Sequence, residues 1–557
     1  GPAGPAGAAG VLPDGAPIPA DLASTYTTAT PIKHLVIIFG ENISFDHYFA
    51  TYPGAVDAGA VGGQPFTPVA DTPKANNLVT PLDPTHGFAA SDAGNLLTDN
   101  PSLTAPGNVD AGVEANPFLL TQSQAATADM NHGYNAEQLA SDNGAMDLFP
   151  LYTGSPDTPA QLALGQPDAA ATQGAVMAYF DGTTLGTLWS YAQNYALNDN
   201  AWTSTFGPST PGAINLVSGQ TNGLGAALPS FASLVTGGYA VPDGTDAGYT
   251  LIDDVDPLGD VCAGSTQGSF SGKNIGDLLN AKGISWGWFH GGFDLTVVNS
   301  NGTTGCNRTS TATVKAIGTV NKVDYIPHHE PFQYYASTAN LAHLRPSSVT
   351  AIGHTLEDDG TTTDPANHQY DSHDFFDALQ AGNFPAVNYL KAPGFQEGHP
   401  GYSDPVDEQV FVAQVVEAVQ ASGDWATTAI VITYDDSDGW YDHQAPPIVN
   451  PSSVAGTDAL NGPGECSHGA QQGDGGTPTT MLLGTAGAPV QGRCGYGTRI
   501  PLLLLSPFAK KNYVDHTLVD QTSTLRFIED NWLSSQRVQD GGSFDTIAGT
   551  LENMLSL

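Results

Sequence analysis

The sequence predicts an α/β fold built on a doubly wound, mostly parallel sheet. Continuous apolar runs of strand length recur along the chain, and helical patterns lie between or after them, an alternation typical of sheets covered by helices on both faces. The runs occupy residues 34–40, 386–390, 428–434 and 500–505, and the clearest helices are expected at 407–419 and 522–533. Such sheets bind ligands at the carboxyl ends of their strands, so polar residues directly after the runs are the first candidates for a site.

The chain is expected to form one large domain with additions. Residues 1–30 are rich in Gly, Ala and Pro and are predicted to be a flexible arm. Residues 31–557 are long enough to bury a large core. Two stretches, around 55–130 and 220–325, are rich in Gly, Asn, Thr and Asp and lack strong periodicity. We interpret them as insertions that form a smaller lobe over the site.

The charge balance limits the classes of partner. The 557 residues include 56 acidic and 15 basic side chains, for a formal net charge of -41. This field repels nucleic acids and anionic membrane surfaces, so we expect no nucleic-acid partner. An anionic substrate such as a phosphate ester would need a metal ion or a local cluster of donors to bind it. No apolar run reaches the length of a transmembrane segment.

The four cysteines fall into two pairs that are local in the sequence, and none forms a CxxC motif. We predict the disulfides Cys262–Cys306 and Cys466–Cys494, although three connectivities are possible and four buried thiols are the alternative. Two disulfides would indicate an oxidising compartment. The chain opens without a signal peptide, and we expect a mature bacterial protein that is periplasmic or secreted.

Hard oxygen ligands follow two of the predicted strands. Glu41 and Asn42 come after the run 34–40, and Asp435 and Asp436 come after the run 428–434. Adjacent carboxylates repel each other unless a cation neutralises them, so this pattern favours one divalent metal ion. The alternative is a pair of solvated turns. An EF-hand loop is excluded because Trp440 stands where that template needs an acid.

Ser209 is the candidate nucleophile. It lies in a turn rich in Gly and Pro just before a predicted helix start, where helix amides and a nearby metal could stabilise an alkoxide. The segment does not fit G-x-S-x-G, because Pro211 occupies the last glycine position. The more common alternative for such a serine is a helix N-cap.

Four histidines in polar segments are candidates for phosphate binding and proton transfer to a leaving group: His132, His328, His329 and His399. A single histidine is more often structural, and we assign His34, His343 and His368 to that class.

Six motifs, in order from residue 32 to about 535, together resemble one bacterial phosphoesterase family, which joins phospholipases C with a group of acid phosphatases. They are ENISFDHYF, GPSTPGAINLVSGQT, YIPHHEPFQYY, GHPGYSDPVDEQ, TAIVITYDDSDGWYDH and DQTSTLRFIEDNW. The resemblance implies an alkaline-phosphatase-like α/β/α sandwich with Ser209 as nucleophile. It also implies that the metal ligands are Glu41, Asn42, Asp435 and Asp436, and that His132, His328, His329 and His399 surround the phosphate.

The departures from the family pattern resemble its acid phosphatase branch. Ile43 stands where the family usually has Arg, and Ser209 and Gly212-Ala213 stand where many phospholipases have Thr and Asn-Arg. We therefore expect a metal-dependent acid phosphatase that hydrolyses phosphate monoesters through a phosphoserine. The alternatives are a phospholipase C acting on phosphocholine-type lipids and a binding protein that has lost turnover. The metal could be Ca²⁺, Mg²⁺, Mn²⁺ or Zn²⁺, and the sequence predicts no oligomeric state.

Overall fold

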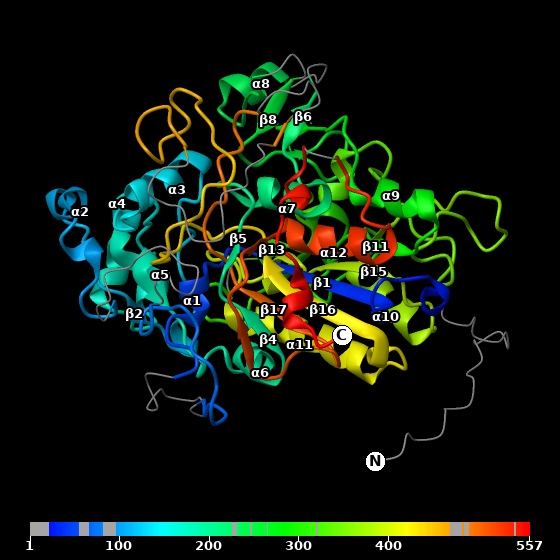
Figure 1. The fold of residues 1–557 in the computed structure, drawn as a ribbon, viewed down its shortest axis with the longest axis horizontal. Helices are drawn as coiled ribbons and strands as arrows, with labels where there is room; N and C mark the ends of the chain where they lie inside the picture. The colour runs from blue at the N-terminus through cyan, green and yellow to red at the C-terminus, as the bar shows by residue number, and fades with distance from the viewer. Residues whose placement is uncertain are drawn as a thin grey trace.

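An eight-stranded mixed sheet forms the centre of the molecule (Figure 1). The computed structural model describes residues 22–54, 66–81, 96–225, 231–244, 248–264, 266–318, 321–467, 482–483, 490–539 and 542–557. In spatial order the strands are β14 (Gln369–Asp371), β11 (Trp286–His290), β15 (Val387–Lys391), β1 (His34–Gly40), β16 (Thr428–Tyr434), β17 (Leu502–Leu505), β4 (Ala196–Asn198) and β18 (Tyr513–Asp515). Within this sheet β17 alone runs opposite to the other strands. The predicted mostly parallel sheet is confirmed.

The two central strands carry the candidate site at one edge of the sheet. All seven residues of β1 and all seven of β16 are buried, as expected for apolar strands covered on both faces. The strands pair in parallel, and Gly40 lies opposite Tyr434 in the register. The chain therefore leaves both strands at the same point, and the residues that follow them become neighbours.

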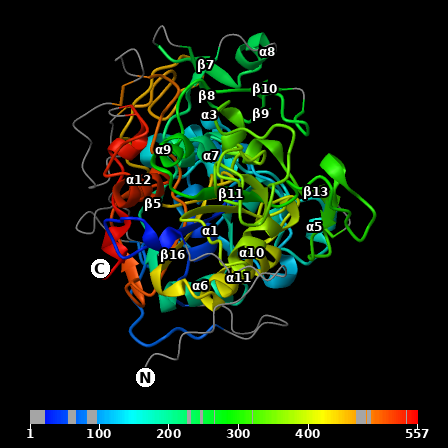
Figure 2. The same ribbon diagram turned by 90° about the vertical axis from the view of Figure 1, so that its right-hand side faces the viewer.

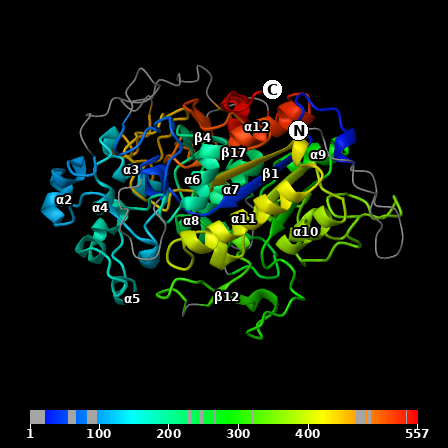
Figure 3. The same cartoon turned by 90° about the horizontal axis from the view of Figure 1, so that it is seen from below.

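Helices cover both faces of the sheet, which makes the fold an α/β/α sandwich. Side chains of β1 alternate between the two hydrophobic clusters that these layers form, with Val36 and Ile38 in one and Leu35, Ile37 and Phe39 in the other. The first layer holds α6 (Gly186–Asn194), α10 (Ser372–Gln380) and α11 (Pro405–Ala421), and the second holds α7 (Ser209–Ser218), α9 (Ile275–Lys282) and α12 (Thr522–Trp532). Figure 1 shows the two layers on opposite sides of β1 and β16, and Figure 3, seen from below, shows α10 and α11 of the first layer.

Shorter elements extend the sandwich at its ends. Helices of the N-terminal third gather at one end of the molecule, and a small three-stranded sheet with one helix projects at another edge (Figures 1 and 2). The former are α1 (Phe45–Phe49), α2 (Pro106–Ala111), α3 (Tyr134–Ala140), α4 (Phe149–Tyr152) and α5 (Pro159–Leu162), and the latter are β6 (Asn222–Leu224), β7 (Ala240–Pro242), β8 (Tyr249–Leu251) and α8 (Phe231–Thr236). The remaining short strands are β2 (Phe118–Leu119), β3 (Ala178–Tyr179), β5 (Ala201–Trp202), β9 (Asp256–Pro257), β10 (Gln267–Gly268), β12 (Thr309–Thr311), β13 (Asn321–Val323) and β19 (Val519–Asp520).

The predicted domain boundaries map unevenly onto these elements. β11 lies inside the range 220–325 and is a strand of the main sheet, so this range is not wholly peripheral. Residues 1–21 of the expected arm lie outside the described residues. At the end of the arm, the amide of Ala29 donates a hydrogen bond to the carbonyl of Asn531 over 3.0 Å. The division into an arm, one domain and insertions stays a prediction.

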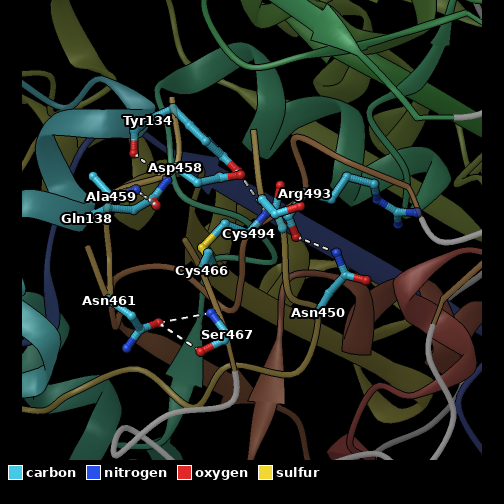
Figure 4. Close-up of a disulfide and its surroundings, with 12 residues drawn as sticks. Tyr134, Gln138, Asn450, Asp458, Ala459, Asn461, Cys466, Ser467, Arg493 and Cys494 are labelled. Atoms are coloured by element: carbon cyan, nitrogen blue, oxygen red, sulfur yellow. Dashed lines mark hydrogen bonds between the residues drawn. A yellow bond between two sulfur atoms is a disulfide. The ribbon is translucent and has the colours of Figure 1, made fainter. Parts of the chain in front are cut away.

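Both predicted disulfides are present. Cys262 bonds to Cys306, and Cys466 bonds to Cys494. The second bridge lies beside Tyr134, whose hydroxyl accepts a hydrogen bond from the Cys494 amide and donates one to Asp458 (Figure 4). These two hydrogen bonds of Tyr134 connect α3 to the segment after β16. Within the described residues, no helix combines the length and apolar character needed to cross a membrane.

Candidate active site

The Ser209 hydroxyl faces the residues that follow β1 and β16. Its Oγ lies 3.1 Å from Glu41 Oε2, 3.1 Å from Asp436 Oδ2 and 3.4 Å from Asn42 Oδ1. Asp435, the fourth predicted ligand, lies beside them: its Oδ1 accepts a hydrogen bond from the backbone amide of Asn42 over 3.0 Å. These five residues, predicted from separate parts of the sequence, form one buried cluster.

Local backbone geometry brings these oxygens together. Asn42 adopts a left-handed conformation with φ of 62°, which asparagine tolerates better than most residues. Helix α7 approaches the end of β16 closely at Gly212, where a Cβ atom would lie 2.1 Å from the carbonyl oxygen of Asp435. Only glycine fits this contact. Gly212 therefore sets the distance between Ser209, one turn earlier in the helix, and the carboxylates.

Ser209 does not act as a helix cap. It is the first residue of α7, and the N-cap position before it is held by Pro208, which makes no side-chain hydrogen bond to the helix. The sequence predicted that the first amides of this helix would bind an anion. One of them is already occupied, because the Thr210 amide donates a hydrogen bond to Asp254 over 2.8 Å. The Ser209 hydroxyl is instead directed at the oxygen cluster.

The cluster has more acceptor oxygens than protons. The Ser209 hydroxyl can donate one hydrogen bond, yet three acceptors surround it, and Asp435 Oδ2 has no hydrogen-bond partner among the described residues. Burial raises the pKa of Glu41 well above its usual value, and the charge of Asp435 raises it further. The same two causes raise the pKa of Asp436. A divalent cation would satisfy these oxygens and keep the carboxylates ionised, so the residues fit a metal ion.

Lys391 is a site residue that sequence reasoning missed. It ends β15, the strand beside β1, and its buried ammonium forms an ion pair with Glu41. Burial lowers the pKa of Lys391, but the charges of Glu41 and Asp435 outweigh this and raise it. The residue stands one position beyond the predicted strand 386–390, so the strand-end rule that selected the acids would also have selected it.

Two of the four predicted histidines contact Asn42. His399 Nε2 lies 2.9 Å from the Asn42 amide nitrogen, and His132 Nε2 lies 3.5 Å from the same atom. Burial and the neighbouring His132 lower the pKa of His399 well below its usual value. Burial also opposes the charged form of His132, but Asp436 and Asp438 outweigh it and raise the pKa of His132 well above its usual value.

The other two histidines lie on the Glu41 side. His329 Nδ1 is 3.2 Å from Glu41 Oε1 and 3.1 Å from Glu397 Oε2. His328 packs edge-on against His329, with ring centroids 4.4 Å apart, and its Nδ1 lies 3.4 Å from Asp256. Three of the predicted histidines, His132, His329 and His399, therefore contact Glu41 or Asn42. His328 instead packs against His329.

Asp438 and Glu397 complete the surroundings and were also missed. Asp438 accepts the Asn42 side-chain amide over 3.1 Å and lies 3.3 Å from His132 Nδ1. Ligand-type atoms gather in two groups beside Ser209: Glu41, His329 and Glu397, and Asp129, His132, His399 and Asp438. Asp438 belongs to the acidic motif after residue 434 and could have been selected from it. Glu397 follows no strand directly, so its position depends on the tertiary fold.

The fold and the site together define a class of α/β protein in which a serine hydroxyl faces candidate cation ligands at the carboxyl ends of the central strands. Within that class, the chain belongs to the Phosphoesterase family, whose model matches residues 32–533. The resemblance drawn from the six motifs is thereby confirmed.

Curated relatives of the chain include phospholipases C. A non-hemolytic phospholipase C of Burkholderia pseudomallei is 34% identical over 160 residues, which cover 28% of this chain and 20% of the relative. Phospholipase C B of Mycobacterium tuberculosis is 22% identical over 511 residues, covering 90% and 73%. Two phospholipases C of Pseudomonas aeruginosa also match, and this chain covers only about a fifth of the length of these relatives and of the Burkholderia relative. A solved structure in the alkaline phosphatase superfamily, from Vibrio parahaemolyticus, is 10% identical with a TM-score of 0.26, covering 80% of this chain and 76% of that one.

Proposed function

We propose that the protein is a metal-dependent phosphatase that hydrolyses phosphate monoesters through a phosphoserine at Ser209. The observation that supports this most directly is the Ser209 hydroxyl, held 3.1 Å from both Glu41 and Asp436 in a buried site. A structural serine does not need two carboxylates as neighbours. A nucleophile does, because an oxygen-rich pocket can hold a cation beside the reacting hydroxyl.

The proposed cation ligands are Glu41, Asn42, Asp435 and Asp436, with Ser209 facing the same point. A bound divalent ion would lower the pKa of the serine hydroxyl and attract the oxygens of the phosphoryl group. The all-oxygen ligand set suits Mg²⁺, Ca²⁺ or Mn²⁺, and the nearby His329 and His399 leave Zn²⁺ open. Lys391 neutralises part of the negative charge on Glu41 and orients its carboxylate.

The chain's own groups supply the nucleophile and the proton donors and acceptors for both halves of the reaction. In the first, the Ser209 oxygen attacks phosphorus, the bond to the leaving oxygen breaks, and the serine proton passes to a carboxylate at 3.1 Å. The leaving oxygen takes a proton from one of the four histidines, His132, His328, His329 or His399. In the second half, water attacks the phosphorus of the phosphoserine, the bond between phosphorus and Ser209 Oγ breaks, a proton from the water returns to the serine oxygen, and inorganic phosphate leaves.

Phospholipase C activity is the second candidate, because the curated relatives carry that name. Hydrolysis rates distinguish the two functions. They are measured for an aryl phosphate, a nucleotide, a sugar phosphate and an aryl phosphorylcholine, with and without added metals. Fastest turnover of a monoester on the acid side of neutral supports the phosphatase. Fastest turnover of the phosphorylcholine diester replaces it with a phospholipase.

We also propose that the protein is exported. Two disulfides link all four cysteines, as expected in an extracellular or periplasmic space. Fractionation of the producing bacterium, followed by immunodetection, tests this; the full protein in the cytosol with free thiols would contradict it.

A further inference from the structure

A lysine lies over a stack of aromatic rings that leads from the buried site to the surface. His399 contacts Asn42, and its ring stacks on Tyr402, with centroids 4.3 Å apart. The ammonium of Lys322 lies 3.7 Å from the centre of the Tyr402 ring. Asn42 is fully buried, His399 is 7% exposed, and Tyr402 and Lys322 are half-buried. Exposure thus rises along this series, which marks one direction in which a bound substrate can reach solvent.

The ammonium of Lys322 has spare binding capacity. Within the described residues, it makes the cation–π contact with Tyr402 and forms no hydrogen bond or ion pair. Burial lowers its pKa, and the charges of Glu397, Asp129 and Glu41 oppose that effect, which places the ammonium in electrostatic reach of the site. In a chain of net charge -41, a cation at this position is a local exception to a field that repels anions.

The hairpin that carries Lys322 is anchored to the sandwich. It consists of β12 and β13 (Figures 2 and 3). Arg308 forms ion pairs with Asp324 over 3.2 Å and with Asp371, at the end of β14, over 3.0 Å. Cys306, just before β12, is held by its disulfide. The hairpin therefore holds a fixed place relative to the main sheet.

The stem of Lys322 is positioned as well. Gly394 donates its amide to the carbonyl of Asp324 over 2.9 Å, and a Cβ at Gly394 would lie 3.0 Å from the Lys322 Cγ. The lysine packs into space that only glycine leaves open. Its ammonium is thus directed over Tyr402 by the surrounding structure.

We propose that Lys322 is a specificity-determining residue that binds a second negative charge on the leaving group of the phosphate ester. The inference rests on the proposed phosphatase function and narrows it to substrates such as nucleotides, sugar bisphosphates or carboxylated esters. Lys322 is connected to Asn42 only through the rings of Tyr402 and His399, so we assign its partner charge to the leaving group and not to the phosphoryl group. It also covers the face of Tyr402 that a choline cation would use, so it disfavours phosphocholine head groups.

The test compares three phenyl phosphates that carry a carboxylate, a neutral carboxamide or a trimethylammonium group in the para position. For each ester, kcat/KM of the wild-type enzyme is divided by that of Lys322→Gln, so differences in leaving-group chemistry cancel. We expect a loss of roughly tenfold for the carboxylate ester, little change for the carboxamide and a gain for the ammonium ester. Lys322→Arg should keep the wild-type order. The matched control is Lys315→Gln, an exposed lysine in the same segment.

An equal loss for all three esters, or none, overturns the inference. Melting temperatures of the variants identify a folding defect, and Lys322→Arg then provides the informative comparison. Calorimetric binding of the matching phosphonates, which cannot be hydrolysed, separates the two proposals. If no ester is turned over but carboxylate-phosphonate affinity still depends on Lys322, the phosphatase proposal fails and this one stands. If the esters are turned over and Lys322→Gln binds the phosphonates with wild-type affinities, this inference alone fails.

Discussion

Ser209 Oγ lies 3.1 Å from Glu41 Oε2, although 168 residues separate the two in the sequence. The contact exists because β1 ends beside β16 and because α7 approaches β16 at Gly212. The nucleophile candidate and the ligand candidate therefore belong to one rigid unit of strand ends and a helix start. Changes to either residue should affect the same chemistry, which the following experiments exploit.

Asp435→Asn should remove the metal and the activity together. In the part of the chain that the structure describes, Asp435 Oδ2 has no hydrogen-bond partner, so this oxygen can bind a cation, whereas an amide lacks the negative charge. Elemental analysis and turnover should fall in parallel. A metal that binds only the folded protein stabilises it by about 2.7 kcal/mol at a concentration 100 times its Kd, so the melting temperature should rise on metal addition in the wild type and not in Asp435→Asn. Asp110→Asn, at an exposed position, is the control. Full metal content in Asp435→Asn would rule out this ligand set.

Glu408 should make the protein more stable in acid than at neutral pH. Its carboxyl group is buried in α11 between the hydroxyls of Tyr48 and Tyr434, and burial raises its pKa from 4.5 to about 7. The folded state therefore holds this proton more tightly than the unfolded state. The stabilisation is complete below pH 4.5 and is lost as pH rises through about 7, a change of up to about 3 kcal/mol.

Urea unfolding of the wild type and Glu408→Gln at several pH values checks this. The glutamine cannot ionise, so the slope of unfolding free energy against pH between 4.5 and 7 should flatten. Glu417→Gln, exposed on the same helix, should keep the wild-type slope. Identical slopes in all three proteins would mean that Glu408 does not titrate in this range.

Removing the Cys466–Cys494 bridge should destabilise the fold without removing the site. The bridge closes a loop with a sequence separation of 28, for which chain entropy predicts a loss of about 3 to 4 kcal/mol. Cys466→Ala with Cys494→Ala should lower the denaturant midpoint while metal content stays near normal. Intact mass before and after reduction and alkylation shows whether both bridges form. Four free thiols in the native protein would contradict both the pairing and the proposal of export.

The sequence allowed the central strands to be predicted better than the edges. The runs 34–40 and 428–434 coincide with β1 and β16, because strands buried on both faces are continuously apolar. β4, β14 and β18 are three residues long, too short for a periodic pattern, and were missed. The run 500–505 was recognised as a strand, but an apolar run carries no information on direction, so the antiparallel course of β17 was not predicted.

The candidate site was predicted where residues follow strands directly. This rule selected Glu41 and Asp435. Lys391 also directly follows an expected strand, 386–390, and was missed because the rule was applied to oxygen ligands only. Ser209 was found from its Gly-Pro turn. Glu397 and Lys322 reach the site through loops and a short hairpin, whose positions depend on contacts distant in the sequence, so no local pattern indicates them.

Ser209 should become transiently phosphorylated during turnover. Its hydroxyl faces the proposed cation site and caps no helix, so Ser209→Ala should leave only slow attack by water, a loss of roughly 10³-fold or more. Melting temperature and metal content should stay native. Acid quench of the wild-type enzyme with labelled substrate should trap phosphate on the peptide that contains Ser209. Ser218→Ala is the matched control, because that hydroxyl, on the same helix, donates to the Ile214 carbonyl and should affect stability more than rate. Near-normal activity in Ser209→Ala, or phosphate trapped on a histidine, would exclude the serine nucleophile.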